Sequence, residues 1–465
     1  MVVACAFTHA RLTAEAQLPP RDLPGLGALV DSVMRSEMAA GKIPGAAVVV
    51  LHRGKVVLER GYGLADLESK RAVDPRTTLW PFASITKVIT ATAVVQLAAR
   101  GRLELGADVN RYLQSVHVPE SRSGPVTVAN LLTHTDALDE LPGRQVPSRD
   151  KVLPLEQFLR NRLVRIGPAG VVTRYGTYGV ALAGVLIQDV SGLRYDQYVD
   201  RNIFAPLGMA HTSIEPPLRS DALIATPYSI DDGKVEKTAP EWYHTTPTSS
   251  LVSTADDMAR FMALHLLTPL SQGTDRVLPR NWVREMARQH ATIHPAIPGW
   301  GYGWQLGDAN GQRVIEHGGD IGGFASLMTL LPDQTFGLIV VNHFEGSSLR
   351  FKLKQAILDR YFPEWRPPRF GTSRPKRDLV AYAGTFLANN YCRTCASGAR
   401  DAQRFEITAN DDGSLGLWGE NWREIAPLLF SSEDGRRRIG FMRDSSGAII
   451  AISAGSWRVL ERSRR

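Results

Sequence analysis

The stretch Pro81–Thr90, PFASITKVIT, places Lys87 three residues after Ser84 in an otherwise apolar segment. In a helix that begins at Ser84, residues i and i+3 lie side by side, so the lysine amine can reach the serine hydroxyl. The segment predicts a helix from Ser84 to Arg100 that is apolar over most of its surface, as in a buried helix. Burial lowers the pKa of a lysine, which can then take the serine proton and make the hydroxyl a nucleophile.

A Ser-x-x-Lys tetrad also occurs by chance in exposed helices, where the serine caps the helix and the lysine is solvated. Partners elsewhere in the chain must therefore support the pair. Tyr175 precedes a Gly- and Ala-rich segment that predicts a helix over Tyr178–Val190. The run His317–Gly319 precedes a segment that predicts a β-strand. His134, in VANLLTHTDAL, is interpreted as a structural residue near a helix end.

Composition and charge exclude several classes of protein. The chain has 465 residues, enough for two or three domains, and its 43% hydrophobic and 22% charged residues are ordinary for a soluble globular protein. The net charge of +7 is spread along the chain without a long basic run interleaved with aromatic residues, so no nucleic-acid partner is expected. No apolar stretch approaches the roughly 20 residues of a membrane-spanning helix, so no integral membrane segment is expected.

The N-terminal segment MVVACAFTHARLTAEAQLPP bears on localisation. It has a short apolar start and then Ala14-Glu15-Ala16, a small-x-small pattern like a signal-peptidase site, but it lacks a basic beginning. The segment is interpreted either as the remnant of a signal peptide or as a disordered cytoplasmic tail. A periplasmic or secreted location is favoured over a cytoplasmic one.

Strand patterns lie on both sides of a region of helix patterns. GAAVVVLHRGKVVLERGYG, residues 45–63, predicts a hairpin with its turn at Arg53-Gly54, and ASLMTLLPDQTFGLIVVNH, residues 325–343, predicts a second one. STADDMARFMALHL predicts a helix capped by Ser253 or Thr254. These patterns predict an antiparallel sheet closed by N- and C-terminal strands, covered by helices, with a largely helical insertion.

The proline-rich run FPEWRPPRFGTSRPKRD predicts a linker, and short alternating runs after it predict a small all-β module. The expected organisation is a tail or signal remnant over 1–24, a main domain over 25–365 and the β-module over 377–465, to which no chemistry is assigned. In this module Cys392 and Cys395 form a lone CxxC motif. Without a second pair for zinc, the motif is either a local disulfide or two free thiols. No metal and no cofactor is expected.

The order and spacing of these motifs, with FAPLGMAHTSI and LVSTADDMARF between them, resemble one known family. Over roughly residues 25–345 the chain is similar to the serine β-lactamase-like family of penicillin-recognising hydrolases. It most resembles class C β-lactamases, D-alanyl-D-alanine carboxypeptidases and family VIII carboxylesterases. The resemblance implies an α/β (α+β) fold, with an antiparallel sheet flanked by helices and a helical subdomain. The C-terminal module resembles small β-barrels appended to some family members.

The resemblance also implies an acyl-enzyme mechanism. Ser84 would be the acylated nucleophile, Lys87 its proton partner, and Tyr175 a shuttle of protons to the leaving group and from the deacylating water. The oxyanion hole would use the backbone N–H groups of Ser84 and Asp320. The substrate-binding residues would be Thr177, His317, Gly318 and Gly319.

Two positions depart from the family pattern. Thr177 stands where the second motif usually has asparagine, and it offers a substrate amide only one hydroxyl. His317 stands where lactamases have lysine, and a neutral imidazole cannot hold a carboxylate as a permanent cation would. Both changes favour a carboxylesterase over an efficient β-lactamase. The alternatives are a D-alanyl-D-alanine carboxypeptidase or D-aminopeptidase, a weak class C-like β-lactamase, and a catalytically silent penicillin-binding or scaffold protein. The expected partner is a small-molecule ester, amide or β-lactam, and the oligomeric state is left open.

Overall fold

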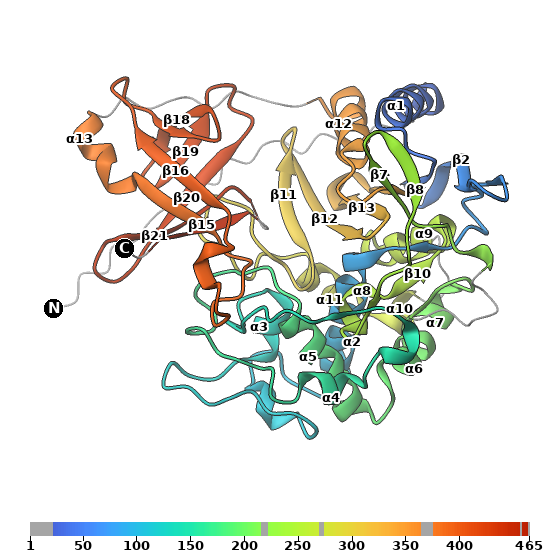
Figure 1. Ribbon diagram of the computed structural model, residues 1–465, viewed down its shortest axis with the longest axis horizontal. Helices are drawn as coiled ribbons and strands as arrows, with labels where there is room; N and C mark the ends of the chain where they lie inside the picture. The colour runs from blue at the N-terminus through green and yellow to red at the C-terminus, as the bar shows by residue number, and fades with distance from the viewer. Residues whose placement is uncertain (1–21, 215–221, 269–273, 364–374, 456–457, 464–465) are drawn as a thin grey trace.

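The computed structural model of the chain describes residues 22–214, 222–268, 274–363, 375–455 and 458–463 (Figure 1). Most of the predicted N-terminal tail and most of the predicted linker lie outside these ranges. Among the described residues, no helix combines the length and the apolar character that crossing a bilayer requires.

A seven-stranded antiparallel sheet forms the centre of the larger part of the molecule, in the order β11-β12-β13-β14-β1-β2-β3. β1 and β14 pair from Ala46 opposite Asn342 to His52 opposite Phe336, so strands from the two ends of this region meet, as predicted. The strands are β1 Gly45–His52, β2 Lys55–Asp66, β3 Arg71–Ala72, β11 Gln305–Ala309, β12 Gln312–Ile321, β13 Phe324–Leu331 and β14 Phe336–His343.

Both predicted hairpins are confirmed. Between β1 and β2, Arg53 and Gly54 have φ values of 51° and 78°, and a turn with two positive φ angles matches the right-handed twist of its strands. β13 and β14 are joined by the short helical turn Pro332–Gln334.

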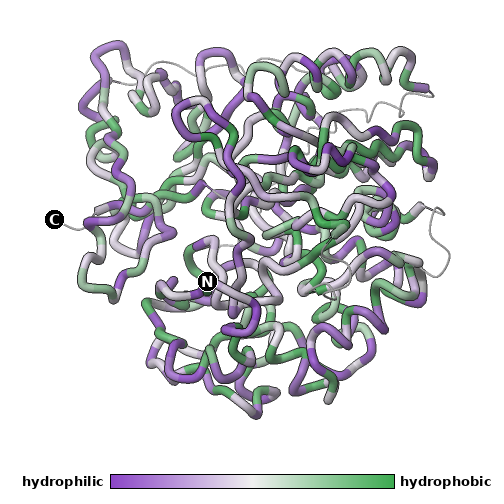
Figure 2. Tube along the Cα trace, turned by 45° about the vertical axis from the view of Figure 1, so that its right-hand side comes forward, coloured by the Kyte–Doolittle hydropathy of each residue, from purple (hydrophilic) through white to green (hydrophobic). Residues whose placement is uncertain are grey.

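Every residue of β1 is buried because helices cover both faces of the sheet. Val48 and Val50 belong to one hydrophobic core, whereas Val49 and Leu51 belong to another. Burial on both faces explains why the strand is a continuous apolar run rather than an alternating one. Figure 2 shows hydrophilic segments mostly along the outer loops. The covering helices are α1 Leu26–Gly41 and α12 Leu349–Tyr361 on one face, and α2 Thr86–Ala99, α9 Ala255–His265 and α11 Arg280–Met286 on the other.

The predicted helical insertion follows α2 and packs on it (Figure 1). Its longest helix, α5, covers Tyr178–Ser191 and ends at Gly192, whose φ of 75° closes a helix without strain. Further along the chain, Thr254, one of the two predicted caps, is the residue that caps α9. The smaller helices are α3 Val128–Leu132, α4 Leu155–Leu159, α6 Tyr195–Val199, α7 Ala205–Leu207, α8 Thr246–Ser249 and α10 Thr274–Val277. Among the short strands, β10 Leu251–Ser253 pairs with both β4 Trp80–Pro81 and β6 Ser213–Ile214, β5 Gln145–Val146 pairs with β9 Trp242–Tyr243, and β7 Tyr228–Asp231 pairs with β8 Lys234–Lys237.

The C-terminal module is a closed eight-stranded barrel that follows α13 (Lys376–Leu379), which confirms the predicted all-β fold. Aromatic side chains such as Phe386, Trp422 and Phe430 fill its interior. Sequence reasoning missed β15, β18 and β19; β18 buries only its tryptophan, and β15 and β19 bury neighbouring residues and so lack a clear alternation. The strands are β15 Gly384–Ala388, β16 Arg404–Ala409, β17 Leu415–Leu417, β18 Glu420–Ala426, β19 Leu429–Ser432, β20 Arg438–Arg443, β21 Ile449–Ser453 and β22 Val459–Arg462.

Candidate active site

Ser84 and Lys87 lie side by side at the beginning of α2. The α-helix begins at Thr86 rather than at Ser84 as predicted, because Ala83–Ile85 form a 3₁₀ turn, a frequent start of helices. The amine of Lys87 donates hydrogen bonds to the Ser84 hydroxyl at 2.9 Å and to the Thr248 carbonyl at 3.2 Å. The turn therefore presents the serine directly to the lysine.

The interior of the molecule surrounds Lys87, which is 3% exposed. Burial, reinforced by the positive charge of Arg144, lowers the pKa of its amine to about 7. A large share of this amine is therefore uncharged at neutral pH and has a lone pair for the serine proton.

Tyr175 lies on the loop before α5 and, with Ser84 and Lys87, makes up the candidate catalytic group. Its hydroxyl hydrogen-bonds to Ser84, and the Lys87 amine lies 5.1 Å from the centre of its ring. The ring stacks on Trp300, with centroids 5.7 Å apart, and contacts the ring of His134 at 4.7 Å. Burial raises the pKa of the Tyr175 hydroxyl, so it is protonated at neutral pH and can donate a proton.

The third motif lies inside β12 rather than before a strand as predicted. Its glycines are poor strand formers, but β13 pairs with the whole segment and holds it extended. β11 pairs with β12 only as far as Glu316, and beyond it β12 packs against the turn that carries Ser84. A Cβ added at Gly319 would overlap the Phe82 carbonyl oxygen and lie 3.1 Å from the Ser84 nitrogen. The approach of strand and turn therefore requires glycine at position 319.

A buried arginine on α12 orients the peptide between Gly319 and Asp320. Arg350 is 4% exposed, and its Nη1 donates to the Gly319 carbonyl at 2.7 Å. Its Nη2 contacts both carboxylate oxygens of Asp320, at 2.8 and 2.6 Å. A planar trans peptide directs its C=O and N–H to opposite sides, so the Asp320 N–H points away from the side on which Arg350 binds the Gly319 carbonyl. This N–H and that of Ser84 are the pair that the resemblance assigns to an oxyanion hole.

The two residues that depart from the family pattern have different surroundings. The Thr177 hydroxyl accepts a hydrogen bond from Nη1 of Arg144. His317 is fully buried, and its Nδ1 donates to the Gly318 carbonyl at 2.7 Å. Its Nε2 has no hydrogen-bond partner among the described residues. Burial, followed by the charge of Lys87, lowers the pKa of His317 to about 3, so the imidazole is neutral.

Sequence reasoning missed three charged residues around this group. Glu140 accepts hydrogen bonds from the first backbone N–H groups of the α5 region, at 2.5 and 3.0 Å. Arg144 lies 3.7 Å from Glu140 and, like it, belongs to a loop without a motif. Arg350 lies 30 residues beyond Asp320. Only the packing of distant segments reveals these residues, and the sequence carries no local signal for them.

The antiparallel sheet, the helical subdomain and the serine–lysine pair at the start of a buried helix define a serine β-lactamase-like protein. The chain belongs to the beta-lactamase family, because the family model described as Beta-lactamase matches residues 30–361. The resemblance noted in the sequence is confirmed.

Known proteins resemble this chain at modest identity. Protein flp of Staphylococcus aureus (strain MRSA252) is 26% identical over 327 residues, 67% of this chain and 62% of that protein. The chain thus spans less than two thirds of the length of this relative. Penicillin-binding protein 4 of Amycolatopsis lactamdurans is 27% identical over 365 residues, 74% of this chain and 93% of that protein. The crystal structure of SurE has a TM-score of 0.68 at 22% identity, covering 94% of this chain and 98% of SurE, which shows a shared fold.

Proposed function

We propose that the protein is a serine hydrolase that forms an acyl-enzyme on Ser84 and prefers carboxylic esters. The observation that carries the proposal is the 2.9 Å contact between the Ser84 hydroxyl and the amine of Lys87, whose pKa is about 7. Membership of a family of serine hydrolases supports it. The neutral imidazole of His317 and the short side chain of Thr177 support an ester over a β-lactam, because an ester needs no holder for a carboxylate or an amide.

In acylation, Lys87 takes the proton of the Ser84 hydroxyl while Oγ attacks the ester carbonyl carbon. The carbonyl oxygen becomes negative, and the backbone N–H groups of Ser84 and Asp320 stabilise it. Tyr175 then gives its hydroxyl proton to the departing alkoxide as the C–O bond breaks, and it regains a proton from Lys87. In deacylation, a water molecule attacks the acyl-enzyme and passes its proton through the same groups to Ser84, which releases the carboxylic acid.

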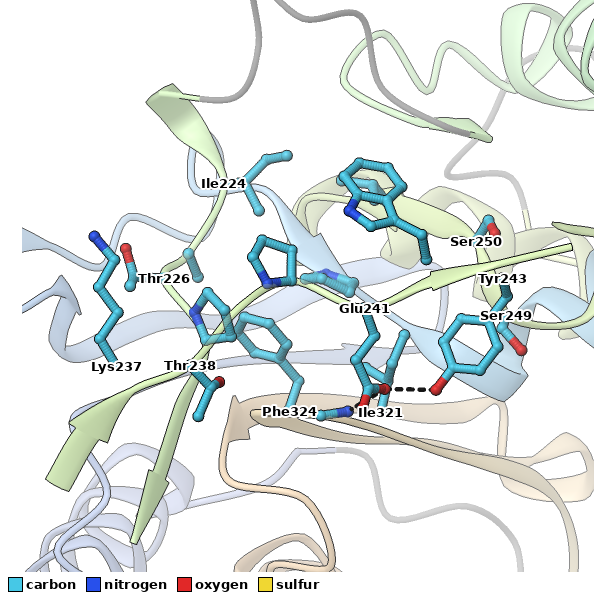
Figure 3. Close-up of a pocket in the computed structure, with 17 residues that line it drawn as sticks. Ile224, Thr226, Lys237, Thr238, Glu241, Tyr243, Ser249, Ser250, Ile321 and Phe324 are labelled. Atoms are coloured by element: carbon cyan, nitrogen blue, oxygen red, sulfur yellow. Dashed lines mark hydrogen bonds between the residues drawn. The ribbon is translucent and has the colours of Figure 1, made fainter. Parts of the chain in front are cut away.

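An apolar cavity of about 280 Å³ is lined by residues that adjoin the site in the chain, although Ser84, Lys87 and Tyr175 themselves do not line it (Figure 3). It is bounded by Pro81, which precedes the turn of Ser84, by Ile321 at the end of β12 and by Ser249 of α8. Glu241 also lines it, but its carboxylate already accepts hydrogen bonds from a tyrosine hydroxyl and a backbone N–H, at 2.5 and 2.9 Å. Such a cavity fits a small apolar acyl group. Its apolar lining includes Ile224, Pro227, Pro240, Trp242, Val252 and Phe324.

A D-alanyl peptidase is the second candidate, and Arg144 favours it. The guanidinium of Arg144 is partly exposed and lies on the Thr177 hydroxyl. It is a permanent cation that can hold a substrate carboxylate, which the neutral His317 cannot do.

We expect a short p-nitrophenyl ester to have a kcat/KM roughly 10-fold or more above that of a chromogenic cephalosporin, because a missing charged hydrogen bond costs about that much. A D-alanyl-D-alanine peptide measured in parallel distinguishes the second candidate, a D-alanyl peptidase, from an esterase. Arg144→Gln should raise the KM of the peptide by about 10-fold, because the peptide has a carboxylate, and leave the KM of the ester nearly unchanged. Faster turnover of the cephalosporin than of the ester would contradict the ester preference.

The rate of acylation should fall as the pH decreases through about 7, because protonated Lys87 has no lone pair for the serine proton. It should level off at higher pH, where the amine is neutral. Arg144→Gln removes a neighbouring positive charge, so it should raise the pKa of Lys87 and move the midpoint to higher pH. The exposed Arg111 offers a control, and Arg111→Gln should leave the midpoint in place. A rate that is flat across this pH range would exclude Lys87 as the base.

A further inference from the structure

The loop that carries Tyr175 contacts the C-terminal barrel through three consecutive residues. Val172 packs against apolar side chains of β21 and β22. The carbonyl of Thr173 accepts a hydrogen bond from Nδ2 of Asn389 at 2.8 Å, and both residues are buried. Arg174, directly before the tyrosine, forms an ion pair with β22. The barrel therefore touches the chain immediately before the candidate proton shuttle.

The ion pair of Arg174 is the centre of this contact. Its Nε and Nη2 donate to the two carboxylate oxygens of Glu461 at 2.7 and 2.9 Å, in the two-pronged arrangement that fixes both side chains. Arg393, from the loop after β15, donates to the same carboxylate at 2.8 Å. Burial raises the pKa of Glu461, but the two arginines outweigh burial and lower it, so the carboxylate is ionised at neutral pH.

The loop after β15 extends from the barrel toward the helical subdomain (Figure 1) and provides a second contact. Asp139 is 1% exposed and accepts hydrogen bonds from the backbone N–H groups of Arg393 and Thr394, at 2.9 and 2.8 Å, and from the Thr394 hydroxyl at 2.7 Å. A disulfide between Cys392 and Cys395, which the sequence left open, closes this loop. The next residue, Glu140, holds the first N–H groups of the α5 region.

The loop of Tyr175 depends on such contacts because it has no regular secondary structure. On its other side, the Arg174 N–H donates to the His134 carbonyl at 2.7 Å, and the Gly176 N–H donates to His134 Nδ1 at 3.3 Å. The backbone around the tyrosine is thus held between His134 and the barrel.

We propose that the C-terminal barrel positions Tyr175 for proton transfer, with Glu461 and Asn389 as positioning residues that fix the preceding backbone. Neither residue touches Ser84 or Lys87, so each acts through Tyr175. This inference rests on the proposed function, because it requires Ser84 to be the nucleophile. It gives the barrel a role in the chemistry although the barrel supplies no reacting group.

The test is a double-mutant cycle on hydrolysis of a short p-nitrophenyl ester. A misplacement of about 1 Å can cost roughly 100-fold in rate, and Glu461→Gln, which keeps the shape and one oxygen acceptor, should lower kcat by about 10-fold. The KM of the small ester should change by less than about 2-fold, because the variant changes proton transfer and not binding. In a Tyr175→Phe background, Glu461→Gln should have almost no further effect, since residues that act as one unit are not additive.

Arg438→Gln is the matched control, because Arg438 pairs with Asp308 across another part of the same interface, at 3.6 Å. It should leave kcat unchanged. A folded Glu461→Gln protein with wild-type kcat, or the same fold-loss with and without Tyr175, would overturn the inference. If Glu461→Gln does not fold, Asn389→Ala removes the side-chain hydrogen bonds to the Thr173 carbonyl and to Glu461 but keeps the Glu461 carboxylate, and the same cycle applies to it with the same contradicting outcomes. Wild-type turnover by Ser84→Ala would instead refute the proposed function itself.

Discussion

Ser84→Ala should lower ester turnover by at least about 10⁴-fold, because the acyl-enzyme cannot form without the hydroxyl. Lys87, Tyr175 and the N–H groups of the oxyanion hole remain in place, so the residual rate reports what they achieve with water. The fold should persist. Ser84 is only partly buried, and the Lys87 amine keeps its hydrogen bond to the Thr248 carbonyl at 3.2 Å.

The intact mass after treatment with a small fluorophosphonate tests the reactivity of Ser84 independently of ester turnover. The wild-type protein should gain one phosphonyl group and Ser84→Ala should gain none. An unchanged melting temperature serves as the control for folding. If the folded variant hydrolyses the ester at a near-wild-type rate, another nucleophile operates and the acyl-enzyme proposal is wrong.

The serine–lysine pair could be predicted from the sequence because its geometry is local. Residues three apart on a helix are neighbours whatever the rest of the chain does, and the surrounding apolar residues already indicate burial. The β1–β2 and β13–β14 hairpins of the central sheet were also predictable, because each carries its own turn signal, whereas the pairings of β12 with β11 and β13 were not predicted. The 3₁₀ turn that holds Ser84 was not, because it depends on how Phe82 and Gly319 meet.

The residues that hold the site in shape could not be predicted from the sequence. Glu461 is 287 residues from Arg174, and nothing in either segment indicates the other. Arg350 contacts the Gly319 carbonyl only because α12 packs across the strands of the third motif. Such contacts are consequences of the packed fold, whereas the motifs themselves are short-range patterns. The sequence therefore located the candidate reacting groups but not their supports.

Gly319→Ala should lower kcat by about 10²- to 10³-fold, the loss typical of a disrupted oxyanion hole. The added methyl would overlap the Phe82 carbonyl oxygen, and it would lie 2.6 Å from the Ser326 hydroxyl and 3.1 Å from the Ser84 nitrogen. Either β12 or the turn of Ser84 must then move, and both carry an N–H group of the predicted hole. Overpacking of this kind also costs roughly 1–3 kcal/mol of stability, so the melting temperature should fall measurably.

Gly307→Ala on the neighbouring strand β11 is the matched control, because the nearest atom to its new methyl would be the Val314 Cβ at 3.6 Å, an ordinary contact. It should change neither kcat nor the melting temperature appreciably. Gly318→Ala is informative in another way, since the protein leaves room for its methyl, with the nearest atom at 3.6 Å. A loss there must come from the substrate and should appear in KM, whereas a loss at position 319 should appear in kcat. Equal losses at both positions would mean that the strand is generally intolerant of side chains, and the oxyanion hole would then need another pair of donors.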